Sequence, residues 1–308
     1  MRILFLGTPA FAVPILEALH ENFEVVGVVT QPDKPAGRKL ALTTPPVKTK
    51  ALELGLPVFQ PEKASEIPGL TEDQHIDFLI TAAYGQILPR EALDIPYEDA
   101  LNVHASLLPK YRGATPLQRA LLNGDKETGI SIMRMEERLD SGPIFSKRKI
   151  DIDPEMRYPD LEKLASSIGA TLLLEVLNQY ERIHPISQDE QEASYCGKIS
   201  KEDGLVDPQK ETARQIFDKL RAYSPWPGVY TRFQGEKLSL LDFSPQRRAR
   251  DEKSFPPGTV FEDEGRVLIS CSTGAIALQQ VQLEGKKPSV AKDFVNGHRQ
   301  FIGSLLPS

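Results

Sequence analysis

Cysteine is scarce in this chain of 308 residues, and its two cysteines lie far apart. Cys196 and Cys271 have no metal-ligand spacing around them, so we expect free thiols in a reducing compartment and no metal site. No apolar run is long enough to span a bilayer. The apolar residues 2–7 are followed at once by Pro9 and Pro14, which favours a first strand over a secretion signal. We therefore expect a cytoplasmic protein, monomeric and without a membrane partner.

A strong net charge is also missing. The net charge is −6, with 40% hydrophobic and 26% charged residues, which describes an ordinary globular protein rather than a generally basic nucleic-acid coat. Residues 206–308 differ, because they hold 15 Lys and Arg against 12 Asp and Glu, whereas the rest holds 22 against 31. Random scatter explains this difference as well as a polyanion-binding surface does. The length favours two domains.

The first half lacks a dinucleotide fingerprint. Residues 3–6 predict a buried strand, 11–19 a helix and 24–29 a second strand. This βαβ opening indicates an α/β fold with a doubly wound, mostly parallel sheet. The first turn, at residues 7–9, reads Gly-Thr-Pro instead of Gly-x-Gly-x-x-Gly, so the sequence disfavours NAD binding.

A basic loop follows the second strand at residues 30–40. Because proline and glycine recur in it, we expect no regular structure there. An ordered loop at the carboxyl end of a strand lies beside the usual ligand crevice of such a sheet. The alternative is a solvated surface loop, which composition alone favours.

The last hundred residues run in short alternating segments separated by turns, between residues 229 and 282. Short strands at such spacing predict a small β-barrel, with a helix at 213–222 before it and another at 290–301 after it. The only tryptophan, Trp226, stands between two prolines. We expect its side chain to fill the core of this domain.

Three polar residues near the middle of the chain form a candidate site. Asn102 and His104 are two residues apart, so on an extended strand both side chains point to the same face. Asp140 precedes Ser-Gly-Pro, a tight turn that presents its carboxylate. No serine lies in a Gly-x-Ser-x-Gly setting, so a nucleophile would have to come from the substrate. The set suits a protein that holds a carbonyl, stabilises its oxyanion and moves protons, although a lone Asn-x-His pair is more often structural.

The longer pattern around these residues is more specific. Residues 102–109 read Asn-x-His-x-Ser-Leu-Leu-Pro, Arg-Gly follows at 112–113, and 139–143 read Leu-Asp-x-Gly-Pro. Together they resemble the signature of the folate-dependent formyltransferases, and the resemblance covers nearly the whole chain. It implies a Rossmann-like catalytic domain followed by an OB-like β-barrel domain that binds tRNA. The expected boundaries are 1–183 for the catalytic domain, 184–205 for a linker and 206–308 for the C-terminal domain.

The resemblance also implies a reaction and a set of site residues. A formyl group would pass from 10-formyltetrahydrofolate, as co-substrate, to the α-amine of methionine on initiator tRNA, without a metal. The implied catalytic residues are Asn102, His104 and Asp140. The implied folate-binding residues are Gln86, Ile87, Leu88, Ser106, Leu107, Leu108 and Pro109. The implied tRNA contacts are Lys34, Arg38, Lys39, Lys286 and Lys287.

Three other functions remain as alternatives. Relatives that formylate a nucleotide sugar, or that hydrolyse 10-formyltetrahydrofolate, share the Asn-His-Asp core and the two-domain length. The loop at residues 30–38 resembles the one with which family members engage the acceptor end of tRNA, and it favours the tRNA substrate. A binding protein that holds folate and RNA without catalysis is disfavoured by the intact Asn-His-Asp set.

Overall fold

The computed structural model describes residues 1–36, 41–72, 74–246 and 255–307, and the chain divides into two compact units. Unit 1 comprises Met1–Leu117, Lys126–Ile152 and Asp160–Lys198. Unit 2 comprises Gln118–Asp125, Asp153–Pro159 and Ile199–Ser308. The final change of unit, after Lys198, falls inside the predicted linker at 184–205. Most of that linker therefore packs as part of unit 1.

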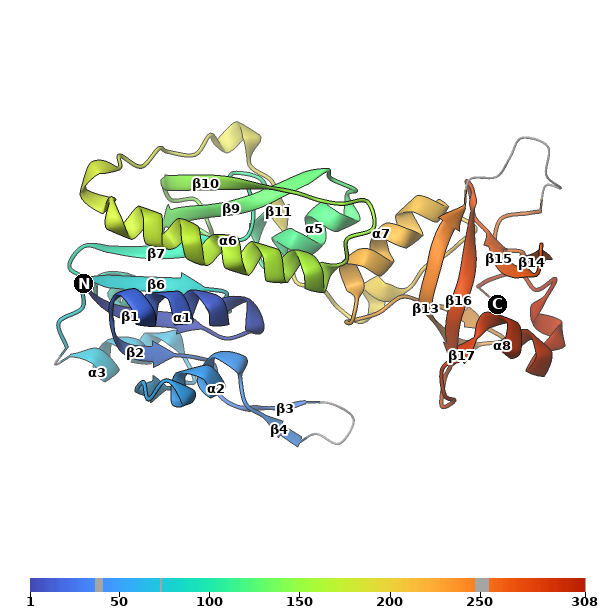
Figure 1. The fold of residues 1–308 in the computed structure, drawn as a ribbon, viewed down its shortest axis with the longest axis horizontal. Helices are drawn as coiled ribbons and strands as arrows, with labels where there is room; N and C mark the ends of the chain where they lie inside the picture. The colour runs from blue at the N-terminus through green and yellow to red at the C-terminus, as the bar shows by residue number, and fades with distance from the viewer. Residues whose placement is uncertain (37–40, 73, 247–254, 308) are drawn as a thin grey trace. The chain divides into compact units, whose positions relative to one another are not determined.

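Unit 1 is built on a seven-stranded sheet in the order β10-β9-β7-β6-β1-β2-β5 (Figure 1). The parallel strands are β1 (Arg2–Gly7), β2 (Glu24–Val29), β5 (Val58–Phe59), β6 (Phe78–Ala82) and β7 (Asp99–His104). Two antiparallel strands complete one edge, β9 (Glu127–Arg134) and β10 (Ile144–Asp151). The predicted α/β class, with a mostly parallel sheet, is confirmed.

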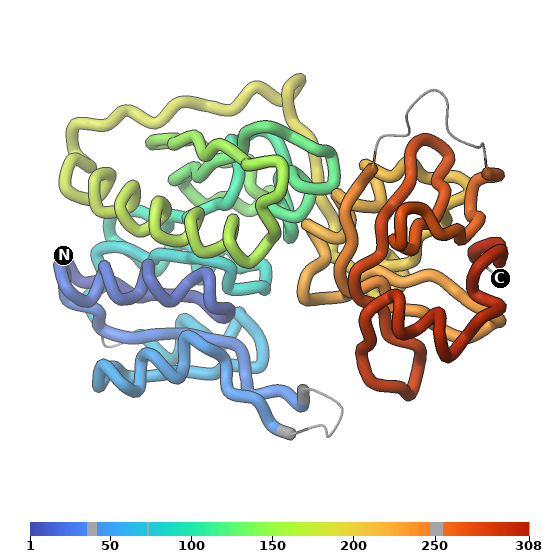
Figure 2. Tube along the Cα trace, turned by 45° about the vertical axis from the view of Figure 1, so that its right-hand side comes forward, coloured from blue at the N-terminus to red at the C-terminus, as the bar shows by residue number. Residues whose placement is uncertain are grey.

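Helices cover both faces of this sheet, as Figures 1 and 2 show from two directions. On one face lie α1 (Val13–Asn22) and α6 (Tyr158–Asn178). Helix α6 approaches β7 closely because it carries Gly169, where an added Cβ would meet Val103 at 2.9 Å. On the other face, α3 (Ile67–Thr71) and α4 (Arg90–Leu93) join a buried cluster with the sheet. Further helices are α2 (Pro46–Glu53) and α5 (Pro116–Leu122).

A short hairpin follows β2, where the sequence predicted an irregular loop. Its strands are β3 (Lys34–Ala36) and β4 (Ala41–Thr43), which pair antiparallel. The prediction was therefore wrong for residues 34–36. A two-stranded hairpin accommodates Pro35 because each strand has an open edge, where a missing N–H leaves no partner unsatisfied. Arg38 and Lys39 lie outside the described residues.

Unit 2 contains an antiparallel sheet in the order β12-β13-β16-β15-β14, with β17 paired to β16. Its strands are β12 (Tyr230–Phe233), β13 (Glu236–Gln246), β14 (Val260–Asp263), β15 (Arg266–Ser270), β16 (Ala275–Leu283) and β17 (Ser289–Val290). Its helices are α7 (Ala213–Tyr223) and α8 (Ala291–Gly297), and the short β11 (Tyr195–Cys196) precedes the unit. The predicted small barrel is confirmed as an antiparallel half-barrel domain.

Trp226 does not fill the core of unit 2, so that prediction was wrong. Its side chain is 54% exposed, because it lies in a turn between two prolines after α7 ends at Tyr223. Phenylalanines occupy the core instead, among them Phe233, Phe243 and Phe301. In the described part of the chain, no helix combines the length and the apolar character that crossing a bilayer requires.

Candidate active site

The candidate site lies at the carboxyl ends of β6 and β7, which is where open parallel sheets bind ligands. Asn102 and His104 occupy the last half of β7, with Thr81 of β6 paired in register to Asn102. Ala100, two residues before Asn102, belongs to the buried cluster that α3 and α4 cover. Strand alternation therefore places the Asn102 and His104 side chains on that same face.

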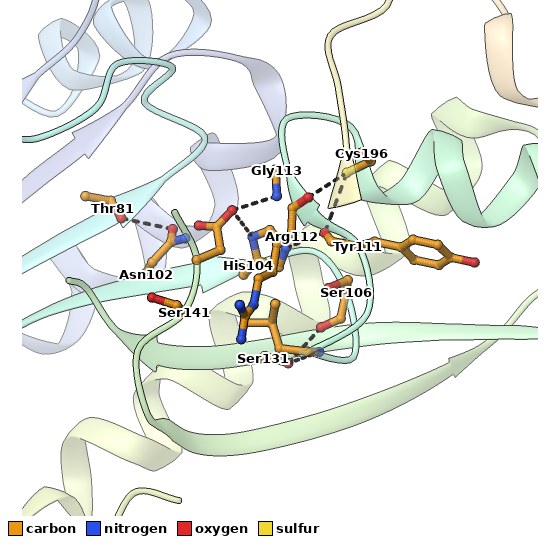
Figure 3. Close-up of polar contacts among 12 residues, drawn as sticks. Thr81, Asn102, His104, Ser106, Tyr111, Arg112, Gly113, Ser131, Ser141 and Cys196 are labelled. Atoms are coloured by element: carbon orange, nitrogen blue, oxygen red, sulfur yellow. Dashed lines mark hydrogen bonds and ion pairs between the residues drawn. The ribbon is translucent and has the colours of Figure 1, made fainter. Parts of the chain in front are cut away.

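Thr81 orients the amide of Asn102, and sequence reasoning missed it. Its hydroxyl donates to Oδ1 of Asn102 at 2.9 Å and to the carbonyl of Leu101 at 3.3 Å (Figure 3). Because the amide oxygen is held in this way, the Asn102 nitrogen turns to the other side as a hydrogen-bond donor. A threonine within the apolar run of β6 was the available signal, but only the β6–β7 register shows what it contacts.

His104 is buried, with acceptors near both ring nitrogens. Its Nε2 lies 3.0 Å from the carbonyl oxygen of Tyr111, which can only accept, so Nε2 carries a proton. Its Nδ1 lies 3.8 Å from Oδ2 of Asp140. At 3.8 Å this contact is too long for a hydrogen bond, so Nδ1 keeps its hydrogen-bonding capacity for a substrate group.

Asp140 is held in a left-handed turn, with φ +48°. Aspartate tolerates this region better than most residues. Its Oδ2 accepts a hydrogen bond of 2.7 Å from the backbone N–H of Gly113. Gly113 lies in β8 (Arg112–Gly113), which pairs with β11, and an added Cβ there would meet the Cys196 carbonyl at 2.2 Å. Only glycine permits this close approach, so the backbone donor to Asp140 depends on it.

The three predicted catalytic side chains thus converge. Figure 3 shows the Asn102 amide beside the His104 imidazole, and the Asp140 carboxylate lies 3.8 Å from that ring. Among the described residues, no group of three or more His, Cys, Asp or Glu side chains is arranged to hold a metal ion. The arrangement suits binding of a carbonyl oxygen by two donors, with a carboxylate nearby to accept a proton.

The predicted folate-binding residues after β7 form a tightly bonded loop. The hydroxyl of Ser131 donates to the Ser106 carbonyl at 2.7 Å and accepts from the Leu108 N–H at 3.1 Å. Leu107 packs over Gly129, where an added Cβ would meet it at 2.4 Å. Ser106 and Leu108 are fully buried, so their side chains support the loop from within. Contact of this loop with folate, Pro109 included, stays a prediction.

The predicted folate-binding turn after β6 is anchored in a similar way. The Gln86 side chain accepts from the Ala64 N–H at 2.9 Å. Leu88 is buried in the cluster with α3, whereas Ile87 is 78% exposed. Ile87 is therefore the apolar side chain that the turn offers to a ligand, and its role stays a prediction. Burial raises the pKa of the neighbouring Tyr84 to about 12, so this phenol stays protonated at neutral pH.

The predicted linker contributes residues to unit 1 that sequence reasoning missed. The guanidinium of Arg112 is fully buried and binds side chains of Gln188 and Glu190. The hydrogen bond from Arg112 holds the pKa of Glu190 below its ordinary value. Gln188 in turn donates to the backbone of the Asp140 turn. The signal in the sequence was the polar character of residues 184–194, which was assigned to a linker.

The predicted tRNA contacts are distributed over both units. Lys34 is exposed at the start of β3, and its ammonium donates to the Gln31 side chain at 2.6 Å. Lys286 and Lys287 are exposed in the turn between β16 and β17. Arg38 and Lys39 lie outside the described residues, so all five assignments stay predictions.

Comparison with known proteins identifies relatives along the whole length of the chain. A formyl transferase model matches residues 1–177, and a model of the C-terminal domain of formyl transferases matches residues 198–299. The methionyl-tRNA formyltransferase of Sorangium cellulosum is 42% identical over 311 residues, covering 99% of each chain. That of Bacillus subtilis is 42% identical over 316 residues, covering 99% of this chain and 97% of its own.

Solved structures share the fold at lower identity. HypX from Aquifex aeolicus, in complex with tetrahydrofolic acid, is 18% identical with a TM-score of 0.66, covering 98% of this chain and 48% of its own. An N-formyltransferase from Helicobacter canadensis, with folinic acid and dTDP-3-aminofucose, is 17% identical with a TM-score of 0.67. It covers 90% of this chain and 98% of its own. These structures show a shared architecture.

Proposed function

The chain belongs to the formyl transferase family, and we propose that it transfers the formyl group of 10-formyltetrahydrofolate to the α-amine of methionyl-initiator tRNA. The product is N-formylmethionyl-tRNA for translation initiation. The observation that carries this proposal is the identity of 42% with methionyl-tRNA formyltransferases over both domains. We further propose that the enzyme acts in the cytoplasm, since charged tRNA is found in that compartment, and that it is a monomer.

Asn102 and His104 provide the two donors for the formyl oxygen. Thr81 holds the Asn102 amide with its nitrogen turned outward, and Nδ1 of His104 lies 3.8 Å from the Asp140 carboxylate, too far for a hydrogen bond, so both groups fit a carbonyl oxygen. Bound 10-formyltetrahydrofolate supplies the formyl carbon. The two donors stabilise negative charge as it develops on the oxygen, and each such donor is typically worth about 10²–10³ in rate.

Asp140 has two parts in this proposal. Its Oδ2, already bound to the Gly113 N–H, faces Nδ1 of His104 at 3.8 Å and orients the ring. Its Oδ1 accepts a proton from the attacking amine, directly or through one water, and a proton is returned to the folate nitrogen as its bond to the formyl carbon breaks, so that tetrahydrofolate leaves. The amine of methionine is the nucleophile, which agrees with the absence of a nucleophile-elbow serine from the sequence.

A transfer assay tests the proposed function. The purified chain is given 10-formyltetrahydrofolate with methionyl-initiator tRNA, with uncharged tRNA, with a dTDP-amino sugar, or with water alone. We expect turnover that requires the charged initiator tRNA. Equal release of tetrahydrofolate without an acceptor would identify a hydrolase, and preferential use of the sugar would identify a sugar formyltransferase.

The proposed tRNA contacts lead to a separate prediction. We expect Arg38→Ala and the double variant Lys286→Ala/Lys287→Ala to raise KM for tRNA while KM for folate stays unchanged. Each lost phosphate contact should also reduce the slope of log KM against log salt by about 1. Lys210→Ala is the matched control, because this exposed lysine pairs with Asp207. Salt slopes that match the wild type in both variants would remove these residues from the tRNA site.

A further inference from the structure

Gln188 binds the turn that carries Asp140. Its Nε2 donates to the backbone carbonyls of Asp140 at 2.9 Å and of Gly142 at 2.7 Å. This turn contains a non-glycine residue at positive φ, a backbone conformation that is strained for residues with a Cβ. Such a conformation persists where surrounding contacts hold it in place. Two hydrogen bonds from one amide, to carbonyls on both sides of Ser141, supply that hold.

Arg112 prevents the Gln188 amide from turning round. The Gln188 Oε1 accepts from Arg112 Nε at 3.0 Å and from Nη2 at 2.9 Å. A reversed amide would place its N–H groups against the guanidinium N–H groups, so only one orientation is satisfied. The Arg112 side chain is 0% exposed, which fixes the guanidinium itself. The Gln188 amide is therefore held with both donors toward the turn.

Hydrogen bonds hold both the side chain and the backbone of Asp140. Gly113, the residue after Arg112, donates its backbone N–H to Oδ2 of Asp140. The Asp140 side chain is thus held by the backbone N–H of Gly113. The Asp140 backbone carbonyl is held by Gln188, which Arg112 orients. Together these contacts set the 3.8 Å separation between Oδ2 and His104 Nδ1.

We propose that Gln188, in a segment the sequence assigned to a linker, is a positioning residue for Asp140. It acts through the backbone of the 140–142 turn and touches no substrate. Its effect on rate rests on the proposed function, in which Asp140 supports His104 and accepts the amine proton.

Gln188→Glu isolates the donor function. Glutamate keeps the size of the side chain and an acceptor for Arg112, but it has no N–H and sets a negative oxygen against two carbonyls. We expect kcat to fall about 10- to 100-fold, since displacement of a catalytic group by about 1 Å can cost 10²-fold. KM for folate and for tRNA should stay within about threefold of the wild type.

Two further variants separate positioning from general damage. Glu190→Gln removes the acidic partner of Arg112 and Arg138 while it leaves both Gln188 donors in place, and its kcat should stay within about threefold. In an Asp140→Asn background, adding Gln188→Glu should lower kcat by less than a further factor of about three, because the carboxylate that Gln188 positions is already absent. An unchanged kcat in Gln188→Glu, or the full loss again in the Asp140→Asn background, would overturn the proposal.

An NMR measurement tests positioning without any turnover. The ¹⁵N signals of the His104 ring should change in Gln188→Glu and stay as in the wild type in Glu190→Gln. Unchanged His104 signals in Gln188→Glu would refute the positioning role even if the enzyme is active. A wild-type chain without transfer to methionyl-tRNA would instead refute the proposed function alone.

Discussion

Replacing His104 with alanine is expected to lower kcat by at least about 10²-fold. The variant loses a hydrogen-bond donor to the formyl oxygen and a group that can transfer a proton. Asn102→Ala removes the second donor, and a loss of about 10²–10³-fold is expected for it as well. Asp140→Ala leaves His104 without its carboxylate and should also lose most turnover. Because the three groups act on one carbonyl, the losses should not add in the double variants.

Single-turnover transfer to methionyl-initiator tRNA measures these losses separately from product release. Thermal unfolding of each variant checks that the fold is retained. Asn22→Ala is a control, because this amide donates to the Ala18 carbonyl on an exposed part of α1. Near-normal rates in all three site variants would end the assignment of the active site.

Asp218→Ala is expected to destabilise unit 2 by about 3–5 kcal/mol, the usual cost of breaking a buried ion pair from one side. Asp218 and Arg221 lie one turn apart on α7, only 4% and 1% exposed, with Oδ1 and Nη1 separated by 2.7 Å. Arg221 also donates to the carbonyls of Met156 and Asp153. Without Asp218, the guanidinium keeps these two carbonyls and loses its buried counter-charge.

Denaturant unfolding followed by tryptophan fluorescence measures this loss. Trp226 is the only tryptophan of the chain and lies just after α7, so it reports on unit 2. Arg214→Ala is the control, because its half-exposed ion pair with Asp218 should be worth no more than about 1 kcal/mol. A loss in Asp218→Ala no larger than in this control would show that the buried pair adds little to stability.

Local periodicity predicted most of the elements of both units. The apolar run at 3–6 and the alternation from 229 to 282 became strands, because burial on one or both faces sets these patterns directly. The prediction that the Asn102 and His104 side chains lie on the same face of one strand followed from strand alternation alone. Trp226 was predicted wrongly, since composition does not tell in which direction a turn carries its side chain.

The hairpin of β3 and β4 was also missed, for a related reason. Pro35 signals a break in any strand that is paired on both sides, but a two-stranded ribbon leaves one edge free. The sequence shows the proline, but it does not show whether the strand will have a neighbouring strand on one side or on both. That number depends on where the segment lies relative to the sheet.

Order along the chain was enough to predict the α/β architecture and a small β-barrel, and to propose the Asn-His-Asp set. Tertiary structure alone decided how that set is held: Thr81 reaches Asn102 across a strand register, and Gln188 reaches Asp140 from 48 residues away. The physical reason is that periodicity records which face of an element is buried. Hydrogen bonds between distant segments depend on how those elements pack, which no local pattern encodes.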